Sequence, residues 1–297
     1  MRSLLRQADN MGKHFSFKNI ALTLMIIHFM IFLVYPIYMA FAGSFHDWNP
    51  LINHYEFTGL DNYRHVLTNG LFWQSIRNTA FFVFFSVVFR IIVGLALAMM
   101  LYSKLARFKT FFRAVFYMPT ITPLIAVSFV WLWLYNPQFG LINNVTGLNI
   151  NWLRNQFWAL PAIILMTIWK DFGYAMVIFM GGLMALPEDV FEAANIDGAT
   201  KLKSFWYMTL PLLKPITLFV TVTSLIAYLQ AYIQIMVMTE GGPGTSSYVI
   251  SYLIFEEAFT RYNFGTASAM SILLFIMIAI LTAVIFKFSG EGVHAIE

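Results

Sequence analysis

The sequence predicts an all-α integral membrane protein with six transmembrane helices. Of its 297 residues, 60% are hydrophobic and 11% are charged, and the mean hydropathy is +0.72, far from the usage of soluble domains. The apolar residues gather in six runs, each near the roughly 20 residues that a helix needs to cross a bilayer. No two-residue alternation competes with these runs, so strands are not expected.

The six spans are expected at residues 20–42, 79–101, 115–135, 158–184, 212–238 and 266–286. Prolines punctuate them in a consistent way. Pro36 is expected to kink the first span, and Pro119 with Pro123 to interrupt the start of the third. Pro161 and Pro215 stand in the first turns of the fourth and fifth spans, where a missing N–H costs little.

The basic residues predict the topology, because Lys and Arg near helix ends are retained in the cytoplasm. Twelve of the 18 lie in the tails 1–19 and 287–297 and in the loops after the second and fourth spans, and four lie in the other loops. The twelve include Arg2, Arg6, Lys13 and Lys104. Both termini are therefore expected in the cytoplasm, flanking one transmembrane domain at 20–286.

Several classes of chemistry are excluded. The chain contains no cysteine, so it forms no disulfide, thiolate nucleophile, Cys-ligated zinc site or iron–sulfur cluster. Its net charge of +4 is accounted for by membrane orientation, so nucleic-acid binding is not expected. The one Gly-Lys pair, Gly12-Lys13, lacks the other residues of a phosphate-cradling loop. No catalytic or metal-binding group is expected, and any ATP must be bound by a partner.

Residues 188–211 form a mixed-charge loop between the fourth and fifth spans. Acidic residues follow Pro187 and favour the first turn of a short helix, and Gly198 permits a tight turn after it. A second amphipathic piece follows, with expected buried positions at Leu202, Phe205, Trp206 and Leu210. The alternative is an amphipathic hairpin that lies on the lipid surface.

This loop resembles the EAA loop of bacterial ABC importer permeases. The pattern of that loop is EAA, any three residues, G, any nine residues, I, any one residue and LP. This chain follows it with Glu192-Ala193-Ala194, three residues, Gly198, nine residues and Met208-Thr209-Leu210-Pro211. Met208 replaces the Ile of the pattern, a volume-conserving change.

Further fragments narrow the resemblance to the carbohydrate branch, the MalF-like or UgpA-like sugar permeases. They are Ser44-Phe45-His46-Asp47-Trp48, Phe57-Thr58-Gly59-Leu60-Asp61-Asn62-Tyr63, Phe72-Trp73, Asn78-Thr79, Asp197-Gly198-Ala199, Thr239-Glu240-Gly241-Gly242-Pro243-Gly244 and Phe264-Gly265-Thr266-Ala267-Ser268-Ala269.

The resemblance implies an importer in a bacterial cytoplasmic membrane with two permease subunits, two cytoplasmic ATPases that hold ATP and magnesium, and an external solute-binding protein. The short helix would then be a coupling helix that docks into the ATPase. Its implied docking residues are Glu192 as the polar anchor, Ala193 and Ala194 as the close-packing surface, and Asp197 and Gly198 at the turn.

Polar residues inside the spans are the candidates for contact with the cargo, because they are costly to place in lipid. Helical spacing puts two sets on two faces: Thr167, Lys170, Asp171 and Tyr174 in the fourth span, and Thr221, Ser224, Tyr228 and Tyr232 in the fifth. The spacing puts Gln230 and Gln234 on the opposite side of the fifth. Hydroxyls and aromatic rings suit a carbohydrate. The alternative is that the Thr and Ser hydroxyls bond their own backbone.

Charged residues within the spans have a second interpretation. Lys170 and Asp171 are adjacent, hence about 100° apart around a helix, and are expected to pair poorly with each other. Arg90 and Asp171 are expected to form a buried ion pair between helices instead.

Two other functions remain open at this stage. One is an ABC permease for amino acids, phosphate or metal, against which the external Gly-Gly-Pro segment argues. The other is a stand-alone secondary transporter, for which internal repeats would be expected.

Overall fold

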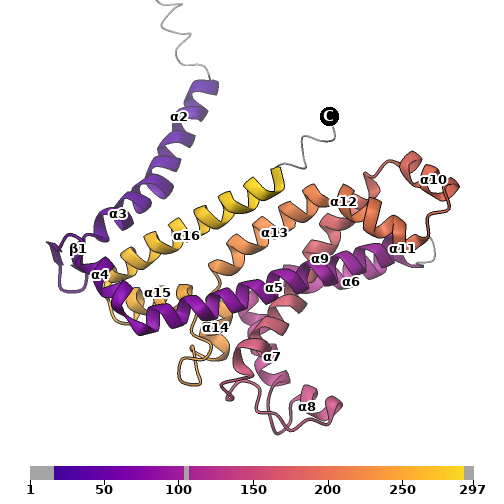
Figure 1. Ribbon diagram of the computed structural model, residues 1–297. Coiled ribbons are helices and arrows are strands. Elements are labelled where there is room, and N and C mark those ends of the chain that lie inside the picture. Colours follow the sequence, from indigo (N-terminus) through magenta and orange to yellow (C-terminus); the bar gives the residue numbers. More distant parts are fainter. Residues whose placement is uncertain (1–16, 104–106, 291–297) are drawn as a thin grey trace, which may run out of the picture. The chain divides into compact units, whose positions relative to one another are not determined.

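The computed structural model describes residues 17–103 and 107–290, and helices dominate it (Figure 1). Most of the expected cytoplasmic tails, including Arg2, Arg6 and Lys13, lies outside the described residues, as does Lys104.

Four stretches of helix are long and apolar enough to cross a membrane, and two bent pairs could each provide another span. The four are Lys18–Gly43, α5 (Gly70–Tyr102), α9 (Ala159–Met184) and Phe264–Phe288 of α16 (Phe264–Gly290). They match the first, second, fourth and sixth predicted spans. The second begins earlier than predicted, because Asn69 Oδ1 accepts a hydrogen bond from Leu71 N at 2.9 Å and caps the helix there.

Prolines stand at irregular points of three helices, and the expected interruption of the third span is confirmed, whereas the first span, with Pro36, is one continuous helix. The third predicted span is α6 (Lys109–Ile121) and α7 (Leu124–Leu134), which meet at 98° around Pro119 and Pro123, where backbone donors are missing. Pro36 and Pro211 each follow a π-helix, η2 (Met30–Val34) and η3 (Phe205–Thr209). In both, the backbone N–H of the residue before the proline donates to the carbonyl five positions earlier, from Tyr35 to Met30 and from Leu210 to Phe205. This wider turn relieves the clash of the proline ring with the preceding carbonyl.

The predicted fifth span is wrong at its end. The stretch Lys201–Leu212 and α13 (Lys214–Leu229) meet at 62°, and the helix stops at Leu229. A non-helical turn separates it from α14 (Ile233–Met238). Ser251 Oγ donates to the Leu229 carbonyl at 2.7 Å, so a side chain satisfies a carbonyl that the missing helical turn leaves free.

The chain falls into two compact units, Met1–Val66 with Glu257–Leu273, and Leu67–Glu256 with Leu274–Glu297. The first unit contains α2 (Phe17–Phe29), η2, α3 (Tyr35–Gly43), most of α4 (Asp61–Thr68) and the start of α16. It also contains a two-stranded antiparallel sheet, β1 (His46–Asn49) with β2 (His54–Phe57), in which His46 pairs with Phe57. This hairpin corrects the all-helical prediction.

Contacts within the first unit explain the hairpin. Asn62 Nδ2 donates to the carbonyls of His46 at 2.8 Å and Ser44 at 3.1 Å. The Trp48 ring lies over Gly43, where a Cβ would come within 2.6 Å of it. Strands this short carry too few residues for a two-residue period to be visible in the sequence.

The second unit is built on α9, which packs against α5, α6 and α13. Small residues allow the close approaches: a Cβ on Gly94 of α5 would lie 2.7 Å from Ala175, and one on Gly173 would lie 2.2 Å from the Phe116 carbonyl of α6. Apolar side chains such as Phe179 and Met176 are fully buried between these helices. This core fixes the polar residues of α9 and α13.

Candidate functional site

The 188–212 segment follows α9 and consists of α10 (Glu188–Ile196), α11 (Lys201–Ser204), η3 and α12 (Leu210–Leu212). The predicted short helix and the Gly198 turn are confirmed. Gly198 has φ +75°, and the next residue, Ala199, donates to the Ala194 carbonyl at 2.9 Å. This pattern is a Schellman motif, which needs a left-handed residue after the helix.

The exposed surface of α10 differs from the expectation at two residues. Glu192, Ala193 and Asp197 are exposed as expected. Ala194, however, is only 5% exposed and is buried in its own chain, so it is not free to contact a partner. Ile196 is 86% exposed and was missed, although it stands four residues after Glu192 and therefore shares its face.

The second part of the segment also corrects the prediction. Leu202 and Trp206 are 68% and 56% exposed, whereas Phe205 and Leu210 are half-buried. The prediction assumed one regular helix, whereas the segment passes from α11 into η3 at Phe205.

A cavity of about 220 Å³, which we call the α9–α13 cavity, brings together most of the predicted cargo residues. Its lining includes Thr167, Lys170, Tyr228 and Tyr232, as well as Asp171. Tyr174 and Ser224 do not line it and lie instead beside Arg90. Contact of any of these residues with cargo stays a prediction.

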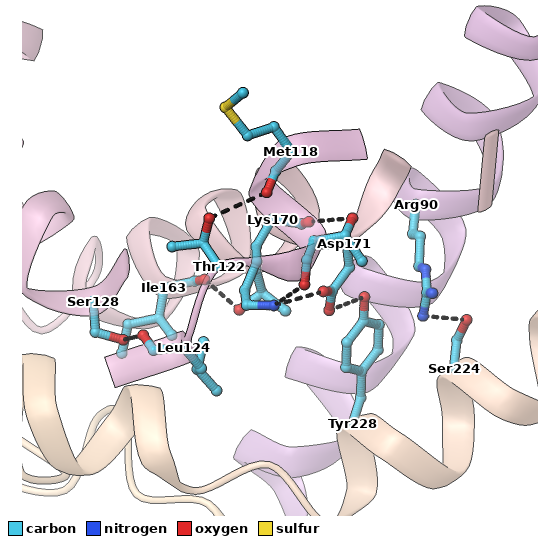
Figure 2. A network of polar contacts seen from close by, with 12 residues as sticks. Arg90, Met118, Thr122, Leu124, Ser128, Ile163, Lys170, Asp171, Ser224 and Tyr228 are labelled. Atoms are coloured by element: carbon cyan, nitrogen blue, oxygen red, sulfur yellow. Dashed lines mark hydrogen bonds and ion pairs between the residues drawn. The ribbon is translucent and has the colours of Figure 1, made fainter. Parts of the chain in front are cut away.

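Asp171 is the centre of a polar network beside this cavity (Figure 2). The Tyr228 hydroxyl donates to Asp171 Oδ2 at 3.2 Å, and Lys170 Nζ lies 3.6 Å from Asp171 Oδ1. The expectation that the adjacent Lys170 and Asp171 pair poorly is therefore wrong, because the long lysine stem folds back. Lys170 Nζ also donates to the Thr120 carbonyl at 3.1 Å, which ties α9 to the bend after α6.

Arg90 takes another place in the network than expected. Its Nη1 donates to Ser224 Oγ at 2.9 Å (Figure 2). Its guanidinium lies 5.2 Å from the Tyr174 ring centre and 5.7 Å from that of Tyr228. The predicted Arg90–Asp171 ion pair is thus replaced by an arrangement in which the Tyr228 side chain stands between the two charges.

Two glutamines that the helical spacing placed on the far side also line the cavity, Gln230 and Gln234. They reach it because α13 ends at Leu229 and the chain turns before α14. Gln234 is 3% exposed, and its Oε1 has no hydrogen-bond partner. An unpaired buried amide oxygen is costly, and this one is enclosed by the fold. No sequence signal marked the break.

Thr167 shows the alternative outcome for a polar residue in a span. It is 2% exposed, and its hydroxyl donates to the Ile163 carbonyl at 2.8 Å. The hydroxyl is therefore already bonded to its own helix.

The chain is similar to known proteins along most of its length. Residues 90–290 match the family described as "Binding-protein-dependent transport system inner membrane component". The chain is 35% identical to the trehalose/maltose transport system permease protein MalF of Thermococcus litoralis, over 87% of this chain and 88% of that protein. It is 31% identical to the lactose transport system permease protein LacF of Rhizobium radiobacter, over 88% and 90%.

A solved structure shares the fold. A chain of a bacterial ABC transporter involved in the import of the acidic polysaccharide alginate superposes with a TM-score of 0.82, at 21% identity, over 96% of this chain and 99% of that one. The family match covers well over half of the residues, and the identity to MalF extends over most of both proteins. This chain is therefore a transport protein that belongs to the family of binding-protein-dependent transport system inner membrane components.

Proposed function

We propose that this chain is one permease subunit of an ATP-driven, binding-protein-dependent carbohydrate importer and forms half of its translocation pathway. The relatives whose names specify trehalose, maltose and lactose support the carbohydrate class. The partners would be a second homologous permease, two ATPase chains that bind ATP and magnesium, and an external solute-binding protein.

In this proposal the chain crosses the membrane six times, each bent helix pair counting as one span. The four continuous spans and the two bent pairs support this number. The distribution of basic residues supports cytoplasmic termini and a cytoplasmic 188–212 segment.

We infer that α10 is the coupling helix. It is connected through a short loop to the C-terminal end of α9, and the 26 residues of α9 extend about 39 Å at 1.5 Å per residue. The same helix carries Lys170 and Asp171 beside the cavity. A displacement of α10 by an ATPase would therefore be transmitted to the cavity through one rigid element. A coupled conformational change requires such an element, together with a partner that contacts it differently in two states.

The α9–α13 cavity would form this subunit's part of the carbohydrate pathway. Among the described residues Gln234 Oε1 accepts no hydrogen bond, and a rotation of this buried side chain toward the cavity would let it accept one from a sugar hydroxyl. The Tyr232 ring stacks on Phe255 with centres 5.3 Å apart, which holds it rigidly at the cavity wall. Fixed aromatic rings and unpaired polar groups are the chemistry that polyhydroxyl ligands require.

The observation that carries this proposal is that α9 has the exposed, glycine-terminated α10 after one end and the polar cavity along its length. The test is uptake of labelled maltose, trehalose or lactose by proteoliposomes. We expect uptake to need the partner permease, the ATPases, the binding protein and ATP. The control replaces the ATPase by a variant that binds but does not hydrolyse ATP. Uptake by this chain alone, driven by an ion gradient, would contradict the proposal.

A further inference from the structure

A larger cavity lies at the other end of α9. This cavity of about 580 Å³, which we call the α7–α14 basin, is lined by residues from the end of α7, from the segment 136–154 and from residues 237–243. The hydroxyl of Tyr135 in its wall donates to the Ala162 carbonyl, in the first turn of α9, at 2.8 Å. The basin therefore lies at the end of α9 opposite α10. Figure 1 shows α8 (Leu141–Thr146) toward one end of α9 and α10 with α11 toward the other.

The basin holds one positive and one negative side chain that do not form an ion pair with each other within the described residues. Arg154 and Glu240 both line it and are both exposed. Within residues 17–103 and 107–290, neither of them takes part in an ion pair or a side-chain hydrogen bond. Amides from Asn136, Gln138 and Asn151 line the same space. The basin therefore presents donors and acceptors around a volume that no side chain fills.

The position of Glu240 is fixed by its own loop. Glu240 has φ +51°, a left-handed conformation that a non-glycine residue keeps only when its surroundings impose it. Its N–H donates to the Ile235 carbonyl at 2.9 Å, and the Thr239 and Ser247 hydroxyls lie 2.8 Å apart across the loop. The backbone of Glu240 is thus held in place before any ligand binds.

A longer-range contact holds the loop against α5. Asn78 Nδ2 donates to the Thr245 and Tyr248 carbonyls, both at 2.9 Å. The wall that carries Glu240 is therefore anchored to a membrane-spanning helix, and preorganisation of this kind lowers the cost of binding.

We propose that the α7–α14 basin is a binding subsite for a neutral carbohydrate on the face opposite α10. A carboxylate accepts hydrogen bonds from two neighbouring hydroxyls, and a guanidinium and amides donate to the others. Arg154 and Glu240 give the lining no net charge, which suits an uncharged polyhydroxyl ligand better than an acidic or basic one. The volume of the basin, about 580 Å³, lies within the roughly 300–1,000 Å³ of small-molecule sites. This inference rests on the proposed function and specifies where the cargo binds before it reaches the α9–α13 cavity.

Direct binding tests the inference. The assembled transporter, in lipid nanodiscs and without binding protein, is mixed in turn with maltose, trehalose and lactose, and saturation-transfer NMR reports sugar contact. We expect saturation transfer to at least one of these sugars with the wild type. Glu240→Gln and Arg154→Gln should each weaken sugar binding about tenfold, which is the effect of losing one charge-assisted hydrogen bond. Glu240→Asp, which keeps the carboxylate, should bind the sugar more tightly than Glu240→Gln. Glu56→Gln and Arg77→Gln, at exposed residues outside the basin, make the same charge changes and should leave binding unchanged.

The other outcomes are distinct. Equal transfer in the wild type and both basin variants would overturn the inference and leave the proposed function standing, because the sugar would then bind elsewhere. Weaker docking of the sugar-free binding protein to Glu240→Gln, with saturation transfer unchanged, would make the basin a protein-docking surface and overturn the inference as well. If the wild type neither binds nor takes up any of the three sugars, the carbohydrate function and the basin assignment fail together.

Discussion

Several large side chains of the 188–212 segment are exposed on its surface, whereas those beside the α9–α13 cavity are bonded to one another. Ile196 and Tyr207 are 86% and 80% exposed, but Arg90 and Tyr228 are 6% and 3% exposed. A surface of the first kind can be altered without loss of folding stability. A network of the second kind both holds the helices together and lines the cavity. A transport defect caused by a substitution there must therefore be compared with the loss of folding stability that the same substitution causes.

The largest effect is expected for Tyr228→Ala, which would sharpen this comparison. The substitution removes a buried ring beside Arg90 and the hydroxyl that donates to Asp171. Truncation of a buried aromatic residue costs about 3–5 kcal/mol. We expect a lower Tm of the purified transporter and a loss of uptake, with ATPase co-purification retained.

Tyr228→Phe is the matched control for that experiment. It keeps the ring and loses one hydrogen bond, worth about 0.5–1.5 kcal/mol. If both variants kept the wild-type Tm, the cavity residues would not hold the helices together, and the contrast between the two regions would be wrong.

The next largest effect is expected for Gly198→Val. A branched residue at φ +75° adds strain of about 1–3 kcal/mol, although the space around a Cβ is open within this chain. The end of α10 should therefore shift, and co-purification of the ATPase should fall roughly tenfold or more, while the membrane core keeps its Tm. Gly198→Asn, which tolerates the left-handed conformation, should bind the ATPase more tightly than the valine variant. Wild-type docking of Gly198→Val would exclude α10 as the coupling helix.

A smaller effect is expected for Ile196→Ser. If this exposed side chain is buried by the ATPase, its loss should weaken docking by about 1.5 kcal/mol, the lower end for burial of an isoleucine side chain. The Tm should not change, because isolated surface substitutions stay within about ±0.5 kcal/mol. Leu202→Ser, at a residue that is 68% exposed but lies beyond Gly198, is the control. Equal weakening by both variants would indicate a general loss of apolar surface rather than a contact of α10.

Local patterns explain what could be predicted from the sequence. Long apolar runs gave the spans at Lys18–Gly43 and Ala159–Met184, because the bilayer sets their length. Gly198 was recognisable because a helix end in the left-handed conformation selects glycine. The bend at Pro119 and Pro123 followed from the chemistry of proline alone.

Tertiary contacts decided the features that the sequence did not reveal. The break after Leu229 contains neither Gly nor Pro, and Ser251 satisfies the carbonyl there, so Gln230 and Gln234 could not be placed at the cavity. The pairing of Lys170 with Asp171 depends on a side-chain rotamer rather than on helical spacing. Burial of Ala194 likewise does not follow from its place in the motif.

The smallest effect is expected for Thr167→Val, which tests whether a residue that lines the cavity also contacts the cargo. Its hydroxyl donates to the Ile163 carbonyl, which also accepts the regular helical bond, so the loss should cost at most about 1 kcal/mol and uptake should stay within twofold. Thr221→Val is the matched control, because Thr221 Oγ1 donates to the Thr217 carbonyl at 2.6 Å and lies outside the lining. If Thr167→Val alone lowered uptake tenfold at an unchanged Tm, the hydroxyl would have to leave its helix to bind cargo. The hydrogen bonds of the cavity side chains would then break more readily than the structure indicates.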